Sequence, residues 1–218
     1  EGNLEDISEY SVSVAGAELN VAIGLTRLGH KAAYMTKLGN DPFGKRIVSS
    51  LNQNGISSEF VTYSSENPTG FMLKAMTSEG DPQICYFRKN SAASTISESD
   101  IENVDFSKYG YLHITGILPA LTQSTRKATF RLIEKAKENG VYISFDPNLR
   151  PQLWENKETM IEVINKLASQ ADIVFPGVAE GEFLMGSREP EKIGEFYLSL
   201  GAKAVVTKVG SRGAVLTT

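Results

Sequence analysis

Residues 16–45 read GAELNVAIGLTRLGHKAAYMTKLGNDPFGK and contain two helix starts separated by an apolar segment. Small and polar residues fill 16–20, where glycine lets the backbone approach a ligand closely before a helix begins. Asn20 precedes an amphipathic run, and Gly29 is expected to end it in the position after the C-cap. The apolar stripe of this first helix is expected at Val21, Leu25 and Leu28.

A second helix start follows the apolar segment Ala32 to Leu38. Asp41 can cap this helix and Pro42 can take its first position, where a missing N–H costs nothing. Its buried stripe is expected at Phe43, Ile47 and Leu51. Either helix start alone is ordinary in an α/β protein. Two in this order favour a ligand site over ordinary helix starts.

Composition bounds the class of protein. The chain has 218 residues, 41% of them hydrophobic, which suits a globular protein with one substantial core. Its 22 basic and 26 acidic side chains give a net charge of −4 with no basic tract, which argues against a nucleic-acid partner. No apolar run approaches the ~20 residues of a membrane helix. The first residues do not resemble a signal peptide, so we expect a cytoplasmic protein without a membrane partner.

Cysteine and histidine are rare in this chain, with one cysteine and two histidines. Cys85 is the single cysteine, so it cannot form an intramolecular disulfide, and no metal-ligand spacing surrounds it. We expect it to be a buried strand thiol, and we expect His113 in the apolar run YLHIT to be buried as well.

From residue 105 onward, short β-rich runs alternate with helical runs. This alternation is typical of parallel βαβ units with helices on both faces of the sheet. Such sheets bind ligands at the carboxyl ends of their strands. The expected strands are Tyr111 to Thr115, Tyr142 to Asp146, Asp172 to Pro176 and Ala204 to Lys208. The expected helices are Thr122 to Asn139, Glu158 to Gln170 and Glu191 to Leu200.

Residues 57–90 follow a different pattern, with three short strands and turn sequences between them. Together with the alternating residues Ser11 to Val14, they suggest a small antiparallel sheet inserted into the α/β body. An ordinary hairpin packed on the main sheet is the alternative. The expected strands are Glu59 to Tyr63, Phe71 to Thr77 and Gln83 to Arg88.

The run G-A-E-x-N-x-A-x-G-L-x-R-L-G, followed by K-L-G-N-D-x-F-G-K, resembles the first signature of the ribokinase-like (PfkB) sugar kinases. The resemblance implies a mainly parallel sheet with helices on both faces and a small antiparallel β lid. It places the lid at 1–15 and 57–90 and the kinase body at 16–56 and 91–218. In that family this segment forms the floor of the sugar site, which implies substrate contacts from Gly16, Ala17, Glu18 and Asn20. Ala15 stands where many members have a second glycine.

Tyr86 and Arg88 are two residues apart, so strand periodicity points both to one face. A guanidinium fork and a phenol could bind a carboxylate, and a solvated lid face is the alternative. The run Y-F-R-K-N-S-A-A-S resembles the corresponding segment of 2-keto-3-deoxygluconate kinases, which bind a sugar acid there. Met72 stands where some relatives have an aromatic contact.

Three further segments follow expected strand ends. Asp146-Pro147-Asn148-Leu149-Arg150 resembles the kinase motif D-x-N-x-R, which implies that Asn148 and Arg150 bind nucleotide phosphates and that Arg150 also lies beside the acceptor; a capping turn with a surface arginine is the alternative. Glu180 matches the end of the family's N-x-x-E motif, which organises Mg²⁺ through water, although Gly177 replaces the asparagine. A carboxylate that stabilises a helix start is the alternative for Glu180.

The third segment, Thr207 to Gly213, reads as a plain hairpin by itself. In the family a K-x-G-x-x-G run borders the ATP site, which implies nucleotide contacts from Lys208, Gly210 and Gly213. The family's second signature, D-T-x-G-A-G-D, is not found in the sequence. Since that signature carries the aspartate that takes the acceptor proton, we expect the base beyond Thr218 and expect these residues to be a fragment, truncated at both ends and inactive alone.

The resemblance as a whole implies an ATP- and Mg²⁺-dependent kinase that converts 2-keto-3-deoxygluconate to 2-keto-3-deoxy-6-phosphogluconate. A fructokinase or ribokinase of the same fold is one alternative. A non-catalytic sensor of a sugar acid or a nucleotide is another. Lid strands often pair between subunits in this family, so a homodimer through the lid is possible.

Overall fold

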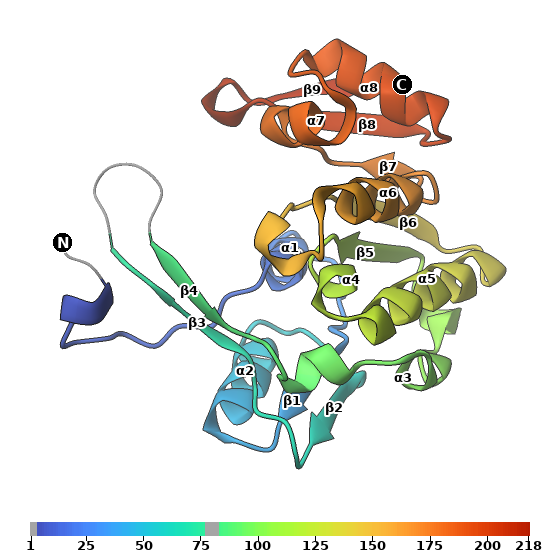
Figure 1. Cartoon of the computed structure of the whole chain (residues 1–218). Helices are drawn as coiled ribbons and strands as arrows, with labels where there is room; N and C mark the ends of the chain where they lie inside the picture. Colours follow the sequence, from blue (N-terminus) through green and yellow to red (C-terminus); the bar gives the residue numbers. More distant parts are fainter. Residues whose placement is uncertain (1–3, 77–82) are drawn as a thin grey trace. The chain divides into compact units, whose positions relative to one another are not determined.

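A computed structural model describes residues 4–76 and 83–218 of the chain (Figure 1). The contacts divide the chain into two compact units, Glu1–Ile96 and Ser97–Thr218, called unit 1 and unit 2 below. The predicted division into a lid and a kinase body stays a prediction.

Unit 1 begins its regular structure with α1, which starts earlier than expected. Gly16 is the N-cap of this helix, so Asn20 lies within its first turns, and its amide donates to the Gly16 carbonyl at 2.9 Å. The predicted apolar stripe is therefore wrong: the buried side chains are Leu19 and Ala22, three residues apart on one helix face, while Leu28 is 77% exposed. The elements of unit 1 are η1 Leu4–Asp6, α1 Ala17–Arg27, β1 Thr36–Gly39, α2 Pro42–Gln53, β2 Val61–Ser64, β3 Phe71–Lys74, β4 Ile84–Phe87 and η2 Ala92–Thr95.

The cap and first residue of α2 are confirmed. The Asp41 carboxylate accepts the Gly44 amide at 2.8 Å through Oδ1, and Pro42 is the first helical residue. Asp41 Oδ2 also accepts the Thr69 amide at 2.7 Å, which ties the start of the helix to the segment before β3. Burial alone would raise the pKa of Asp41, but these amide hydrogen bonds outweigh it and hold the pKa below its usual value.

The strand pairing of unit 1 differs from the expected three-stranded antiparallel sheet. β2 pairs in parallel with β1, and only β3 and β4 form an antiparallel hairpin. Alternation in a sequence shows which side chains share a face but not which strand is the partner, and this explains the error. Residues 11–14 form no strand, and the predicted turn at 78–82 lies outside the described residues.

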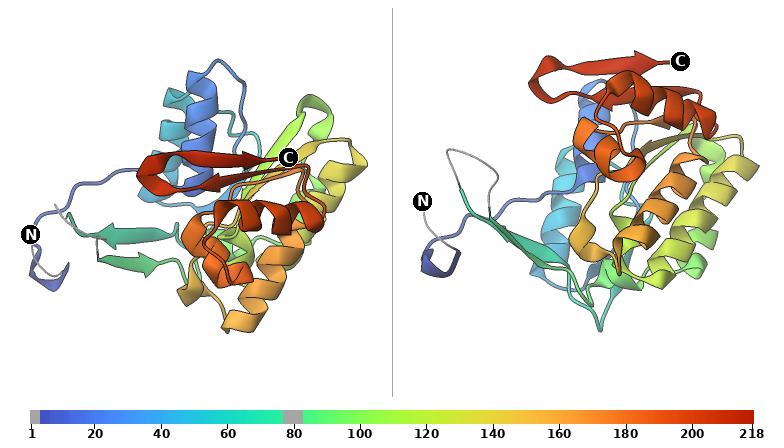
Figure 2. Two further views of the ribbon diagram at one scale, coloured as in Figure 1. Left: turned by 90° about the horizontal axis from the view of Figure 1, so that it is seen from above. Right: turned by 45° about the horizontal axis from the view of Figure 1, so that its top comes forward.

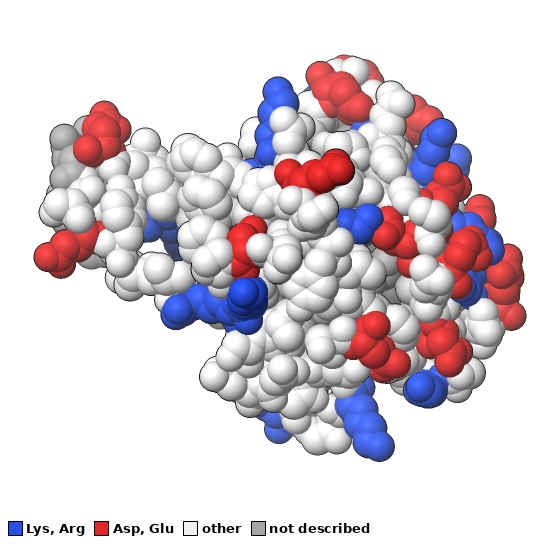
Figure 3. All heavy atoms as spheres, turned by 90° about the horizontal axis from the view of Figure 1, so that it is seen from below, with Lys and Arg blue, Asp and Glu red and all other residues white. Residues whose placement is uncertain are grey.

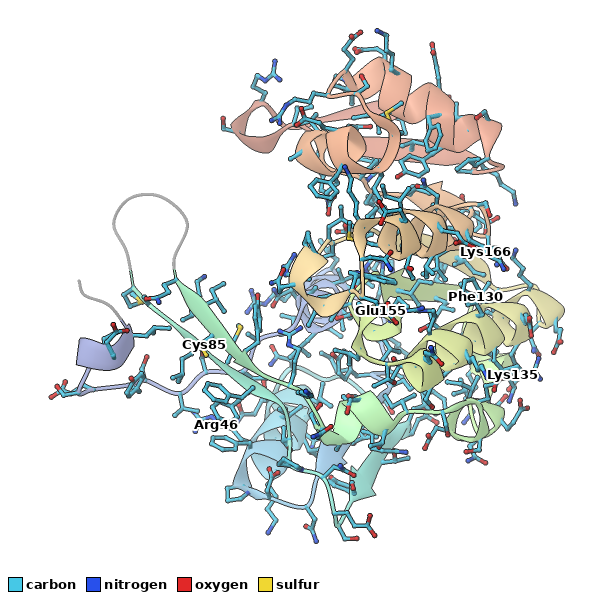
Figure 4. All side chains as sticks on the ribbon, viewed as in Figure 1. Arg46, Cys85, Phe130, Lys135, Glu155 and Lys166 are labelled. Carbon is cyan, nitrogen blue, oxygen red and sulfur yellow. The ribbon has the colours of Figure 1, made fainter. Side chains whose placement is uncertain are left out.

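The β3–β4 hairpin carries exposed aromatic side chains on one face. The Phe71 and Phe87 rings stack at 4.6 Å, and Phe43 of α2 lies 5.7 Å from Phe71. Phe43 is 45% exposed, so its predicted burial is wrong. The prediction of a buried Cys85 is also wrong, because this thiol is exposed on β4 (Figure 4).

Unit 2 contains a five-stranded sheet in the order β5-β6-β7-β8-β9, parallel from β5 to β8 with β9 antiparallel to β8. Helices α5, α6 and α8 lie on one face of this sheet (Figure 2). The core includes fully buried side chains at Phe145, Ile164 and Tyr197. The elements are α3 Glu98–Glu102, η3 Phe106–Lys108, β5 Tyr111–Thr115, α4 Leu118–Leu121, α5 Gln123–Glu138, β6 Tyr142–Asp146, η4 Pro151–Leu153, α6 Lys157–Ala168, β7 Ile173–Val174, α7 Val178–Met185, α8 Pro190–Ser199, β8 Ala204–Lys208, η5 Gly210–Arg212 and β9 Ala214–Thr217.

The remaining sequence expectations concern burial and surface. His113 is half-buried on β5 rather than fully buried, and its Nδ1 lies 2.9 Å from the Ser144 hydroxyl. Among the described residues, no helix combines the length and the apolar character that crossing a bilayer requires. Acidic and basic side chains are intermixed on the face drawn in Figure 3.

Candidate active site

The first candidate group lies at the start of α1 in unit 1. A Cβ at Gly16 would meet Leu19 Cβ at 3.3 Å and would lie 3.6 Å from the Tyr34 hydroxyl oxygen, so a larger residue would fill the space beside the helix start. Asn20 is exposed there, while Ala17 and Glu18 are half-buried. The exposed amide side chain is available to a polar ligand, and the predicted substrate contact stays a prediction.

Tyr34 is a candidate that sequence reasoning missed. Burial, and then the nearby negative charge of Glu18, raise the pKa of this phenol above its usual value. Its hydroxyl group lies beside Gly16, where it can donate a hydrogen bond. The only signal in the sequence was a tyrosine in an apolar run, which favours a core residue.

The second candidate group lies on the hairpin of unit 1. The guanidinium carbon of Arg88 lies 4.0 Å from the centroid of the Tyr86 ring, so the two side chains share a face, as strand periodicity predicts. Both are half-buried. Stacking on the ring restricts the rotamers of the Arg88 side chain. Met72 is the cross-strand partner of Tyr86 in the hairpin register.

The third group gathers the three segments of unit 2 that follow strand ends. Lys208, the last residue of β8, places Nζ 2.7 Å from both carboxylate oxygens of Asp146, the last residue of β6. Nζ also lies 4.0 Å from Glu180 Oε2, which comes from the segment after β7. The carboxyl edge of the sheet thus assembles these residues, as the parallel topology predicts. Asp146 had no assigned role in the sequence, because its partner lies 62 residues away.

Both carboxylate oxygens of Glu180 accept backbone amides. Oε2 accepts the Gly177 amide at 2.6 Å and caps α7, while Oε1 accepts the Leu149 amide at 2.9 Å. The alternative that Glu180 stabilises a helix start is therefore correct for its Oε2 atom. Its predicted role beside a hydrated metal ion stays a prediction.

Arg150 and Asn148 lie in the loop after β6. One guanidinium nitrogen of Arg150 donates to the Leu149 carbonyl at 2.7 Å, and the side chain is half-buried. Asn148 has a φ of 40°, in the left-handed region that asparagine tolerates better than most residues. Its amide donates to Asp146 Oδ1 at 3.1 Å.

Gly210 and Gly213 lie in the turn between β8 and β9. Their φ angles are 64° and 95°, which residues with a Cβ rarely adopt. The backbone of the turn is therefore sufficient reason for glycine at both positions. The plain-hairpin reading of Thr207 to Gly213 is correct as a description of the backbone. The predicted nucleotide contacts of the two glycines stay predictions.

A nucleoside triphosphate and its Mg²⁺ fit the chemistry of the strand-end residues of unit 2, Asp146, Arg150, Glu180 and Lys208. Arg150 and Lys208 are the cations that could meet phosphate oxygens there, and Lys208 is also paired with Asp146. The described residues contain no group of three or more side chains that could hold a metal ion directly. Mg²⁺ usually keeps several waters and binds substrate phosphates, so Glu180 and Asp146 would hold it only through water.

Comparison with known proteins identifies the family of the chain. The profile of the pfkB family carbohydrate kinases matches residues 1–218. The chain is 45% identical over 218 residues to 2-dehydro-3-deoxygluconokinase of Bacillus subtilis (strain 168), covering 100% of this chain and 67% of that protein. The chain spans about two thirds of the length of the curated relatives that it matches.

Solved structures share the fold. The PfkB protein from Polaromonas sp. JS666 superposes with a TM-score of 0.92 at 40% identity, over 99% of this chain and 73% of that one. The fructokinase from Vibrio cholerae O395, solved with fructose, ADP and a calcium ion, gives 0.84 at 28% identity, over 94% and 65%. The fold is therefore ribokinase-like. With its signature at the start of α1, its hairpin and its strand-end residues, the chain belongs to the pfkB family of carbohydrate kinases.

Proposed function

We propose that the whole protein is an ATP-dependent sugar-acid kinase that phosphorylates the terminal hydroxyl of 2-keto-3-deoxygluconate, giving 2-keto-3-deoxy-6-phosphogluconate. The observation that carries the proposal is the 45% identity to a 2-dehydro-3-deoxygluconokinase over all 218 residues. In this assignment Gly16, Ala17, Glu18 and Asn20 bind the sugar hydroxyls.

Arg88 supports an acid over a neutral sugar. Its guanidinium is stacked on Tyr86, so its rotamers are already restricted. A bidentate contact to a carboxylate would therefore cost less conformational entropy. A neutral sugar offers no charge to this group. Fructose is nevertheless the substrate of the second candidate function, because fructokinases are also among the relatives of the chain.

Phosphoryl transfer depends mainly on position and electrostatics. ATP supplies the phosphoryl group, and Mg²⁺ neutralises charge on its phosphates. Arg150 and Lys208 contribute positive charge at the carboxyl edge of the unit 2 sheet, with Asn148, Gly210 and Gly213 as further nucleotide contacts. Glu180 holds the hydrated metal ion only indirectly.

The test is a coupled ADP-release assay on the whole protein with 2-keto-3-deoxygluconate, fructose and ribose. We expect turnover with the acid. Good turnover with fructose or ribose and none with the acid rejects the proposal in favour of the neutral-sugar kinase. No turnover with any sugar favours a non-catalytic sensor.

Arg88→Ala sharpens the same test, with Lys89→Ala as the matched control. Lys89 is the next residue and is exposed, so its replacement removes an equal charge from the same segment. A lost hydrogen bond to a charged group costs about 1.5–3 kcal/mol, or roughly 10- to 100-fold in kcat/KM for the acid. The Arg88 variant should lose far less with a neutral sugar, and Lys89→Ala should change neither.

We also propose that a second copy of the chain covers the apolar face of the hairpin. A two-stranded hairpin by itself is marginally stable in water, and here Phe43 of α2 stacks on Phe71. The register places Phe71, Leu73, Cys85 and Phe87 on one face, and Phe71 and Phe87 are 43% and 46% exposed. This face is uncharged, which suits a copy of itself better than a charged partner.

Cys85 reports on this interface because it lies within the face. Alkylation of its thiol should slow as protein concentration rises, in step with a doubled mass by light scattering. Phe87→Glu should give a monomer with fast labelling, whereas Tyr63→Glu, at an exposed tyrosine on β2, should leave the dimer intact. A labelling rate that does not depend on concentration contradicts the dimer.

A further inference from the structure

Two carboxylates hold the loop that carries Arg150. Asp146 Oδ1 accepts the Asn148 amide at 3.1 Å, and Glu180 Oε1 accepts the next amide, that of Leu149, at 2.9 Å. The Asp146 and Glu180 side chains are only 22% and 18% exposed, so these hydrogen bonds compete little with water. Two successive amides of the loop are thus fixed by side chains from two different strand ends.

Lys208 links the two carboxylates. Its ammonium group lies 2.7 Å from both oxygens of Asp146 and 4.0 Å from Glu180 Oε2. The backbone amide of the same residue donates to the Pro176 carbonyl at 2.7 Å, just before the segment that carries Glu180. One cation therefore offsets the repulsion between two negative groups and fixes their spacing.

The other side of the loop is closely packed. A Cβ at Gly116, the residue after β5, would lie 2.2 Å from the Pro147 carbonyl oxygen, so only glycine allows this approach. Asn148 then turns the chain with its positive φ of 40°. The path from Asp146 to Arg150 is consequently held from both sides, and the position of the Arg150 backbone follows from it.

We propose that Asp146 and Glu180 are positioning residues that set where Arg150 meets phosphate, and that Lys208 acts chiefly as the cation that holds them in place. The inference rests on the proposed function, in which Arg150 binds phosphate. It makes a prediction opposite in sign to simple electrostatics. Carboxylates near an anion site repel the anion, so removal of one should strengthen binding unless its positioning role matters more.

Two variants of Glu180 separate these accounts. Glu180→Gln removes the charge but turns an amide NH₂ toward one of two backbone donors, so the hydrogen bond to Gly177 or Leu149 is lost. Glu180→Asp keeps the charge but is one methylene shorter, so it cannot serve both amides. Glu182→Gln is the control, because Glu182 lies on the same helix, is 56% exposed and pairs with Arg188.

The measurements are backbone hydrogen exchange and binding of tripolyphosphate by calorimetry, both on the whole protein. A lost hydrogen bond of about 1.5 kcal/mol corresponds to roughly 10-fold faster exchange at Leu149 or Gly177. Tripolyphosphate should bind several-fold more weakly to both Glu180 variants, although one of them has lost a negative charge. The Glu182→Gln protein should exchange like the wild type and bind at least as tightly.

The outcomes distinguish the inference from the function on which it rests. Unchanged exchange in both Glu180 variants, or tripolyphosphate binding as tight as in Glu182→Gln, overturns the positioning role alone. A wild-type protein that binds no tripolyphosphate rejects the phosphate site of the proposed function. In that case the functional part of the inference is overturned too, even where the amides respond.

Discussion

Asp41 shows how much of one residue a sequence can predict. Its capping role follows from local chemistry, because an aspartate before Pro42 can accept a backbone amide of the first helical turn. Its second hydrogen bond, to the Thr69 amide, could not be predicted, because the two residues are 28 positions apart. The Thr69 hydroxyl in turn accepts the Gly39 amide at 2.9 Å, so one carboxylate anchors a small buried network.

Replacement of Asp41 by Asn should reveal both roles. An amide accepts one of the two backbone donors and opposes the other, so we expect a loss of roughly 1–2 kcal/mol in the free energy of unfolding at pH 7. Urea titration measures it. Glu66→Gln, at an exposed acid in the same unit, should change the free energy by much less.

The pH dependence of Asp41 has a definite sign. Its folded pKa lies below the unfolded value of about 3.9, so its contribution is fully present above that value and is lost as pH falls through the folded pKa. The difference between wild type and Asp41→Asn should therefore shrink below about pH 4. A difference that stays constant from pH 7 to pH 3 contradicts the assigned ionisation.

At the scale of elements, hydrophobic periodicity predicted the strands β5, β6 and β8 with their observed bounds and the helices α5, α6 and α8 within a few residues. It failed where tertiary contacts decide. The buried face of α1 differs from the predicted one, because the helix begins at Ala17. Strand β2 pairs in parallel with β1 instead of joining the hairpin. Local pattern fixes the type of an element, whereas its partner depends on the rest of the chain.

Two glycines inside helices provide an element-scale prediction. A Cβ at Gly194 of α8 would lie 2.2 Å from Thr217 Oγ1 of β9, whereas a Cβ at Gly24 of α1 would meet nothing within 4 Å. Gly194→Ala should therefore push α8 from β9 and cost about 1–3 kcal/mol of unfolding free energy. Gly24→Ala should instead stabilise the protein by up to about 1 kcal/mol, since alanine favours helix.

Thermal denaturation of both glycine variants provides the measurement. Equal shifts of the same sign in the two variants would show that backbone propensity alone governs these positions, contrary to the packing described for α8 and β9.

For the whole molecule, the sequence predicted the family, the parallel sheet and the gathering of three segments at its carboxyl edge. It did not predict the contacts among them, because Asp146, Glu180 and Lys208 come from three different strand ends. Parallel topology brings strand ends to one edge of a sheet, but only the folded packing decides which side chains pair.

Ligand binding provides a prediction at this scale. A nucleotide that binds only the folded state at 100 times its Kd adds about 2.7 kcal/mol of stability. Mg·ATP should therefore raise the Tm of the whole protein by roughly 3–6 °C, and Arg150→Ala should remove most of the shift. Differential scanning calorimetry checks both, and an unchanged Tm at saturating Mg·ATP contradicts nucleotide binding.

The ion pair between Asp146 and Lys208 also has a consequence for folding kinetics. It joins residues 62 positions apart, so we expect it to form only after β6, β7 and β8 have aligned. Interactions that form after the transition state slow unfolding and leave the folding rate almost unchanged. The residues proposed to position Arg150 would then also lengthen the lifetime of the native protein.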